Sequence, residues 1–354
     1  MDTWPLVSVI IPCHNGMPWV PHAVRSALRQ TYPNVEVILV DDESADESRA
    51  VVEAEFGDAV RIIGIPHSGA GAARNVGFGS AGGEYVQFLD ADDILIPEKI
   101  ERSIACFLDQ PDTDIVYTAI HQPTVHDFVD ESAFTAAEFA RTVDLMVEQA
   151  YEFHFRGTGM PSLATPQPIY RSRLLREHGG FDETLLLLED VELVCRQVFN
   201  GARVEHVPMV GVVYRDHPGD RLTNQLRYEY EAYYRAAVKL IELAREHGRM
   251  SGAIQDFAML FLIWQAALEC VRKRTYRSAE KYVALAREIS PRLPGPAIFR
   301  GLAHVIGTIP ALAVARVVLD TFVRLFPARA RVLLGPMAVE VVLEHQRSRT
   351  RGKR

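Results

Sequence analysis

The sequence has no long apolar run, no surplus of positive charge and no targeting pattern at its start. No stretch reaches the roughly eighteen apolar residues of a membrane-spanning helix; the nearest, 301–315, is interrupted by Pro310. The formal net charge of −8 over 354 residues argues against general nucleic-acid binding. The first residues lead directly into a strand pattern, so we expect no signal peptide and a cytoplasmic protein.

Cysteine is scarce and lacks the spacing of metal ligands. The four residues are Cys13, Cys106, Cys195 and Cys270. The first three lie in apolar surroundings, which indicates buried thiols in a reducing compartment rather than a disulfide framework or a zinc site.

A glycine-rich signature directly after the first strand is also missing. That position reads Pro12-Cys13-His14-Asn15. A dinucleotide-dependent oxidoreductase would carry Gly-x-Gly-x-x-Gly there, and a nucleotidyltransferase would carry a glycine-rich segment with a lysine. Both enzyme classes are therefore disfavoured, although the nucleotidyltransferase stays as an alternative.

The first 120 residues contain short β-branched runs that alternate with helical patterns. The runs are Leu6–Pro12, Val35–Val40, Val60–Ile65 and Glu84–Leu89. This alternation predicts an α/β fold with a mainly parallel central sheet, flanked by helices through right-handed crossovers. In such a sheet the carboxyl ends of the strands meet at one edge, where ligands bind.

Three carboxylates end the fourth strand abruptly, at Asp90, Asp92 and Asp93. Clustered acids at the end of a buried strand repel one another and call for a cation, and Mg²⁺ or Mn²⁺ takes oxygen ligands. The bland alternative is a strand–turn–helix junction in which Asp93 caps the helix opened by Pro97. That alternative explains one aspartate of the three, so we expect a metal site beside a phosphorylated ligand.

Other polar features fall at the same predicted edge. They are Asn15 after the first strand, Asp42 after the second, and the loop Gly69–Gly77 with Arg74. Each has a plain structural explanation: a turn, a helix N-cap, and close packing of a helix on the sheet. Their joint placement favours one ligand crevice that also includes the acid cluster.

The remainder of the chain divides at about residue 222. The stretch Phe155–Pro168 has no periodicity and predicts a long functional loop. Strand signals vanish beyond about Thr223, so we expect domains at 1–222, with halves at about 1–120 and 121–222, and a helical region at 223–354. Its tail, about 347–354, is strongly basic and predicts disorder or peripheral contact with anionic lipid.

Five short motifs follow one another along residues 5–222. They are Val7–Pro12 with Asn15, Val40–Ser44, Gly71–Gly77, Leu89–Asp93, and Gly180–Glu183 leading to Glu189-Asp190. In this order they resemble glycosyltransferase family 2. The resemblance implies the GT-A fold and an inverting transfer of sugar from a nucleotide-diphosphate sugar, most often a UDP-sugar. It makes about 1–120 the nucleotide-sugar half of the domain and about 121–222 the acceptor half.

The resemblance implies roles for residues of the first two strand ends. Pro12, His14 and Asn15 match part of the pocket for the nucleotide base. Asp42 matches the acid that accepts a hydrogen bond from a pyrimidine ring. Glu43 departs from the family, which usually has glycine there, and this changes the turn rather than the chemistry.

The resemblance also implies the roles of the charged centre. Arg74 matches a nucleotide contact near the diphosphate, Asp90 the ribose side, and Asp92 the direct ligand of Mn²⁺ or Mg²⁺. Asp190 matches the catalytic base, with Glu189 orienting rather than taking the proton. His217 sits where related enzymes contact the diphosphate or the metal.

The chemistry agrees with these roles. A metal and a cation stabilise a departing diphosphate, and a carboxylate takes the proton of the attacking hydroxyl. One base and one displacement imply inversion, because no second nucleophile is evident. Neither Gln-x-x-Arg-Trp nor transmembrane helices occur, which favours transfer of a single sugar to a carbohydrate or lipid-linked acceptor in polysaccharide synthesis. A non-catalytic scaffold that keeps the fold is the remaining alternative.

Overall fold

The computed structural model describes residues 4–121, 163–215 and 230–248, with residue 284. The chain separates into two compact units: residues 1–152 with 161–226, and residues 153–160 with 227–354. The described part of the first unit holds one sheet and its helices. The described part of the second unit is residues 230–248, most of which form the helix α9 (Tyr230–Glu246), and residue 284.

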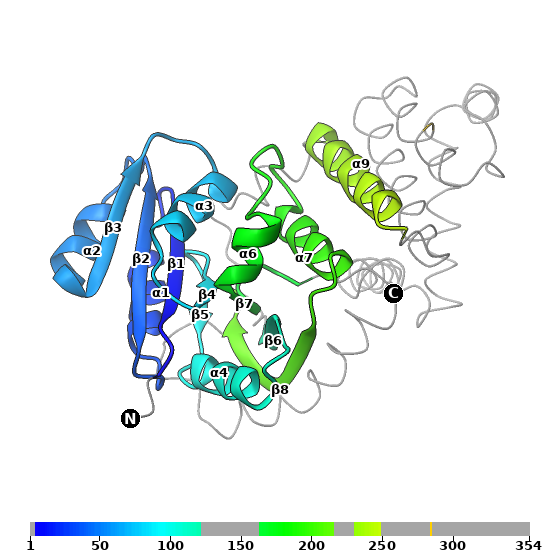
Figure 1. Ribbon diagram of the computed structural model, residues 1–354. Helices are drawn as coiled ribbons and strands as arrows, with labels where there is room; N and C mark the ends of the chain where they lie inside the picture. Colours follow the sequence, from blue (N-terminus) through cyan, green and yellow to red (C-terminus); the bar gives the residue numbers. More distant parts are fainter. Residues whose placement is uncertain (1–3, 122–162, 216–229, 249–283, 285–354) are drawn as a thin grey trace, which may run out of the picture. The chain divides into compact units, whose positions relative to one another are not determined.

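One eight-stranded sheet organises the first unit (Figure 1). In chain order its strands are β1 (Val7–Cys13), β2 (Val35–Asp42), β3 (Val60–Ile65), β4 (Tyr85–Phe88), β5 (Ile94–Leu95), β6 (Ile115–His121), β7 (Pro168–Arg171) and β8 (Val204–Val213).

The sheet order is β3-β2-β1-β4-β7-β6-β8-β5. The pairs β3–β2, β2–β1, β1–β4 and β6–β8 are parallel, whereas β7 runs antiparallel to both of its neighbours and β5 runs antiparallel to β8. The expected mainly parallel sheet is confirmed. Its first three parallel pairs bring the carboxyl ends of β2, β1 and β4 side by side.

Helices flank the sheet. They are α1 (Val20–Leu28), α2 (Ser48–Phe56) with the 3-10 turn η1 (Gly57–Ala59), α3 (Ala70–Ser80), α4 (Lys99–Asp109), α6 (Ser172–His178) and α7 (Glu189–Phe199). In Figure 1, α6 and α7 lie side by side.

Alternation along β1 and β2 explains why the sheet lies between two helix layers. Val9 and Leu39 belong to one core with the apolar faces of α1, α2 and α4, whereas Ile38 and Val40 pack with Ala73 of α3 on the other face. Successive side chains of a strand point to opposite faces, so a strand covered on both sides reads as a continuous apolar run. That is the pattern Val7–Pro12 shows.

Two strands differ from the sequence-based expectation. β7 begins at Pro168, at the end of the predicted loop, and β5 has two residues. Both are too short to show a period, and a proline normally argues against a central strand. β7 tolerates Pro168 because its partner there is Tyr117 at the edge of a three-residue pairing.

Three further predictions concern residues outside the described ones. They are the basic tail at 347–354, the peripheral membrane contact and most of the loop at 155–168. Within the described part of the chain, no helix combines the length and the apolar character required to cross a membrane. Among those residues Cys13 and Cys195 are buried thiols outside any disulfide, as expected, whereas Cys106 is only half-buried.

Candidate active site

Three adjacent parallel strands deliver polar residues to one edge of the sheet. β1 ends at Cys13 and is followed by His14 and Asn15; β2 ends at Asp42; β4 is followed by Asp90. The predicted meeting of these strand ends is confirmed by the sheet register, in which Cys13 pairs with Asp41. Their side chains gather in two groups, one on β1 and β2 and one at β4.

The first group contains His14, Asp42 and His67. His14 Nδ1 lies 2.6 Å from the backbone oxygen of Asp42. His67 Nδ1 lies 3.1 Å from Asp42 Oδ2, and the two imidazole rings are 4.2 Å apart. The buried Asp42 carboxylate also accepts the N–H groups of Ser68 at 2.7 Å and Gly69 at 2.9 Å. Asp42 therefore fixes the loop that leads into α3.

Asn15 joins the ends of β1 and β2. Its backbone φ is +52°, a left-handed conformation that asparagine tolerates better than most residues. Its side-chain oxygen accepts the Ala45 N–H at 2.8 Å, and its N–H donates to Ser44 Oγ at 3.0 Å. Pro12 lies two residues before His14, buried within β1 and paired with Val40 of β2.

The second group is centred on Arg74 of α3, which is 4% exposed. Its guanidinium donates to Asp90 Oδ1 at 2.7 Å and to Glu189 Oε1 at 2.9 Å. The Phe181 ring lies 4.9 Å from the guanidinium carbon. Arg74 thus connects the turn after β4 with the first residue of α7, which is 115 positions further along the chain.

Burial alone would lower the pKa of Arg74, but the two carboxylates Asp90 and Glu189 outweigh it and raise the pKa above its usual value. The arginine is therefore a fixed positive charge. Asp190 has the opposite balance: burial and the negative charge of Glu189 raise the pKa of its carboxyl to about 7. A carboxyl with a pKa near neutrality is a suitable proton acceptor at neutral pH.

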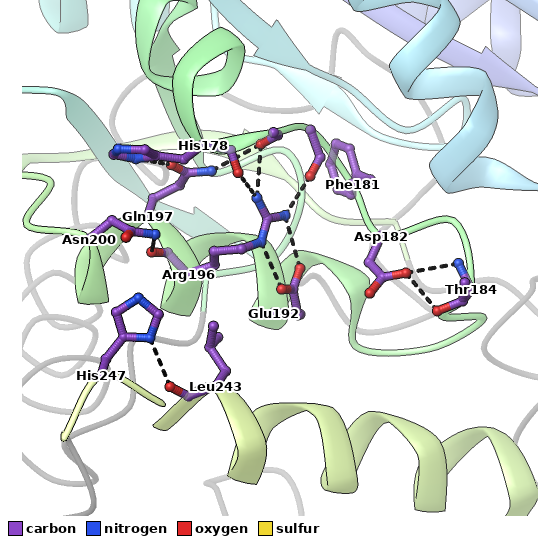
Figure 2. A network of polar contacts seen from close by, with 12 residues as sticks. His178, Phe181, Asp182, Thr184, Glu192, Arg196, Gln197, Asn200, Leu243 and His247 are labelled. Atoms are coloured by element: carbon purple, nitrogen blue, oxygen red, sulfur yellow. Dashed lines mark hydrogen bonds and ion pairs between the residues drawn. The ribbon is translucent and has the colours of Figure 1, made fainter. Parts of the chain in front are cut away.

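Arg196, in the last turn of α7, makes several polar contacts with Glu192 and with the segment before Phe181 (Figure 2). Arg196 bonds to Glu192 at 2.8 Å and donates to the carbonyl oxygens of His178, Gly179 and Gly180. Phe181 follows these three residues directly. Arg196 thereby joins α7, which carries Glu189 and Asp190, to the segment that packs under Arg74.

The three aspartates after β4 make different contacts, and these do not match the alternative in which Asp93 caps the following helix. Asp90 binds Arg74, and Asp92 is half-buried in the same turn. Asp93 does not cap α4, which begins at Lys99 without a side-chain cap. Instead, the fully buried Asp93 accepts the Arg215 N–H at 2.9 Å and joins the turn after β4 to the end of β8.

The structure places most of the predicted residues at this edge. His14, Asn15 and Asp42 form the first group, with Pro12 buried beneath them; Arg74 and Asp90 form the second, with Asp190 in the first turn of α7. His217 lies outside the described residues.

Sequence reasoning missed His67 and Arg196 and gave Phe181 no role of its own within the Gly180–Glu183 motif. His67 is a single histidine in a loop without a pattern, and Arg196 reads as an ordinary surface position of a helix. The spacing of four between Glu192 and Arg196 was a signal for their ion pair.

Comparison with known proteins identifies the family of the chain. Residues 8–179 match the family model "Glycosyl transferase family 2". The succinoglycan biosynthesis protein ExoO of Rhizobium meliloti (strain 1021) is 30% identical over 319 residues, which cover 86% of this chain and 88% of ExoO. An uncharacterized glycosyltransferase of Rickettsia felis is 41% identical, over 32% of this chain and 19% of that protein.

A solved structure shares the fold. Residues 1–349 of S. aureus TarS, in complex with UDP-GlcNAc, superpose with a TM-score of 0.58 at 20% identity over 82% of each chain. At this identity the likeness concerns the GT-A fold alone. The family match disfavours the nucleotidyltransferase and scaffold alternatives. The chain belongs to glycosyltransferase family 2 and is a glycosyltransferase.

Proposed function

We propose that the protein is a metal-dependent, inverting glycosyltransferase. It moves a single sugar from a nucleotide-diphosphate sugar, with UDP as the nucleotide, to an acceptor hydroxyl in polysaccharide or glycoconjugate synthesis. The domain division at about residue 222, the cytoplasmic location and the peripheral membrane contact remain predictions that accompany this proposal.

The observation that carries the proposal is the ion pairing of Arg74 with both Asp90 and Glu189. In this proposal Asp90 belongs to the side that binds the nucleotide sugar. Glu189 directly precedes Asp190, the proposed base for the acceptor hydroxyl. A sugar that reacts between donor and acceptor has to lie between these two sides. A buried arginine paired with both sides holds them at a fixed separation, which favours a positioned displacement.

The proposed chemistry needs one base. Asp190 takes the proton of the acceptor hydroxyl as the oxygen attacks the anomeric carbon, and the bond to the diphosphate breaks on the opposite face. The configuration is therefore inverted. Because the pKa of Asp190 is raised to about 7, its carboxylate is a stronger base than an ordinary aspartate and is still ionised above neutral pH. Arg74 keeps Glu189 paired, so Glu189 orients α7 rather than competing for the proton.

The donor chemistry of the turn after β4 fits a hard divalent cation. Asp90 and Asp92 are both half-buried and supply carboxylate oxygens, the ligands that Mg²⁺ and Mn²⁺ prefer. When bound, such an ion would supply charge neutralisation for the departing diphosphate, with Asp92 as the direct ligand. Asp90 and Arg74 orient the nucleotide side.

The relatives support the substrate class. ExoO is described as a succinoglycan biosynthesis protein, and the TarS structures contain UDP-GlcNAc or UDP. We extend a nucleotide-sugar donor and a saccharide product to this chain on that basis. His14, Asn15 and Asp42, with Pro12 beneath them, form the proposed base pocket. His217 completes the proposed donor contacts.

The experiment is hydrolysis and transfer with a panel of nucleotide sugars in the presence of Mn²⁺ or Mg²⁺, with the anomeric configuration of any product read by NMR. We expect one UDP-sugar to be turned over with inversion, and only with added metal. If no nucleotide sugar of the panel were hydrolysed or transferred, and no nucleotide raised the melting temperature, the proposal would be contradicted. Retention of configuration would contradict the single displacement.

Asp92→Asn separates the metal role from the fold. The isosteric amide keeps the shape of the turn and removes one anionic oxygen ligand, so metal-dependent nucleotide binding should be lost while the melting temperature changes little. The measurement is calorimetric titration of UDP with and without Mn²⁺. Tight metal-dependent binding by the variant would remove Asp92 from the site.

A further inference from the structure

Two imidazoles and one carboxylate face one another at the ends of β1 and β2 and in the loop before α3. In His14, Asp42 and His67, one candidate ligand atom from each side chain lies within 4.8 Å of the others. The two histidine rings are exposed, whereas the carboxylate is buried. These three residues, which we call the His–Asp–His cluster, are separate from the carboxylates of the turn after β4.

The backbone holds this cluster in place. The Asp42 carboxylate is fixed by the N–H groups of Ser68 and Gly69. His14 Nδ1 lies 2.6 Å from the Asp42 carbonyl oxygen, so this nitrogen carries the proton and Nε2 keeps its lone pair. A hydrogen bond from the other ring nitrogen to a carbonyl is the outer contact that metal-binding histidines make.

The ligand types select the ion. Two neutral imidazoles and a carboxylate suit Zn²⁺ and the late first-row divalent ions, whereas Mg²⁺ and Mn²⁺ are better suited by oxygen ligands. Tetrahedral Zn²⁺ places its ligand atoms about 3.3 Å apart. The side chain of His67 is 56% exposed and can turn to reach this distance between ligand atoms. The side chain of Asp42 is 3% exposed and stays fixed.

We propose that His14, Asp42 and His67 form a binding site for Zn²⁺ or a similar transition-metal ion, with three protein ligands and an open position. His14 gives up the hydrogen bond from the Asn15 amide, at 3.0 Å from Nε2, when the ion binds. His67 Nδ1 gives up its contact with Asp42 Oδ2, and the proton of the neutral ring then lies on Nε2.

The site has a consequence for the enzyme, and this consequence rests on the proposed function. His14 and Asp42 also belong to the proposed base pocket, so zinc and the nucleotide compete for the same residues. Zinc therefore inhibits transfer, and a higher donor concentration overcomes the inhibition. Zinc binding itself does not depend on the donor assignment.

The test uses the full chain without nucleotide. Zn²⁺ affinity is measured by competition with a chromogenic chelator, and Co²⁺ reports the ligand geometry by its visible absorption. The variant is His67→Gln, because His67 is not among the proposed donor contacts. His22→Gln is the matched control, since His22 is a half-buried histidine on α1 outside the cluster.

We expect the native chain and His22→Gln to bind one equivalent of Zn²⁺, and His67→Gln to bind it at least tenfold more weakly with loss of the tetrahedral Co²⁺ spectrum. Equal affinity of His67→Gln, or no binding by the native chain, would overturn the site. Zinc binding in a chain that turns over no nucleotide sugar would support the site and count against the proposed function alone.

Discussion

Asp190 has a carboxyl group whose surroundings disfavour its charge. Burial is the main cause of its raised pKa of about 7, and the neighbouring Glu189 adds to it. The unfolded chain has an ordinary aspartate, with a pKa of about 3.9. Because the folded state holds the proton more tightly, the group lowers the stability of the fold progressively as pH rises from about 4 to about 7. The charge that the proposed base needs is therefore a cost to folding.

Asp190→Asn should separate catalysis from stability. The amide still accepts the Val191 N–H, which Asp190 Oδ1 accepts at 2.8 Å, but it carries no charge. At pH 8 we expect a melting temperature a few degrees higher than that of the native chain, with the gain fading toward pH 4. Turnover should fall by roughly 10²- to 10⁴-fold, as for loss of a general base.

Calorimetry at both pH values and initial rates give these two quantities. Asp112→Asn is the control, because the Asp112 side chain is 81% exposed and its removal should leave both quantities nearly unchanged. A less stable Asp190→Asn variant with normal turnover at pH 8 would assign Asp190 a structural role instead.

Residue types also show where prediction from sequence stops. The order of Asp42, Arg74, Asp90 and Asp190 along the chain was enough to predict a common site by resemblance. Lys99 was not predictable: a lysine in an amphipathic helix reads as exposed, yet it is 0% exposed and donates to the Gln87 side chain and the Gln167 carbonyl. Its partners come from β4 and from the segment before β7, and no local pattern contains such long-range pairs.

At the scale of elements, a glycine of α3 allows this helix to pack closely on β1 and β2. A Cβ added to Gly77 would overlap Ile10 Cγ2 and lie 3.1 Å from Val40 Cγ2, whereas a Cβ on Gly79 meets nothing within 4 Å. The two glycines belong to the same helix. The sequence allowed either a ligand-binding or a packing explanation for this glycine-rich segment, and Gly77 favours the packing one.

Gly77→Ala and Gly79→Ala should therefore change stability in opposite directions. We expect Gly77→Ala to lower the free energy of unfolding by roughly 1–3 kcal/mol through overpacking. Gly79→Ala should raise it by up to about 1 kcal/mol, because alanine favours helix. Urea denaturation of both variants measures the difference. A tolerated Gly77→Ala would mean that α3 can move away from the sheet without cost.

Arg196 joins α7 to the segment that precedes Phe181. Its guanidinium pairs with Glu192, whose side chain is 1% exposed, and donates to carbonyl oxygens in the segment that precedes Phe181. Removing one partner of a buried pair leaves the other charge without compensation. The Arg203–Asp112 pair has the same charges, but its side chains are 66% and 81% exposed.

Arg196→Met should lower the free energy of unfolding by roughly 3–5 kcal/mol, whereas Arg203→Met should change it by less than about 1 kcal/mol. Chemical denaturation at constant pH gives both values. If Arg196→Met proved as mild as the control, α7 and the segment before Phe181 would have to be held by apolar packing instead.

The elements were predicted unevenly for a physical reason. β1 and β2 are largely buried runs rich in β-branched residues that specify a strand by themselves. β3 is an edge strand with one buried residue, and Val60–Ile65 was predicted with the bounds that the structure shows. β7 is four residues long and depends on β4 and β6, which pair with it on either side. Its strand state is a consequence of the sheet, so its own sequence contains little sign of it.

At the scale of the whole molecule, the described residues of the proposed site belong to one of the chain's two compact units. All described donor-side residues, from His14 to Asp92, and the proposed base Asp190 belong to the unit of residues 1–152 and 161–226. We expect acceptor choice to involve the acceptor half at about 121–222 together with the helical region at 223–354, so removal of the helical region should affect transfer more than donor binding.

A chain shortened to residues 1–226 should then bind UDP and Mn²⁺ with the affinity of the full chain. Slow hydrolysis of the nucleotide sugar should persist, because metal, nucleotide and Asp190 remain, while transfer to the acceptor should fall. Titration calorimetry measures the first quantity, and product analysis separates hydrolysis from transfer. A matched Asp92→Asn version of the short chain controls for nonspecific binding. If the short chain had native circular dichroism but no nucleotide affinity, residues after 226 would have to complete the donor site, because no described donor contact would have been removed.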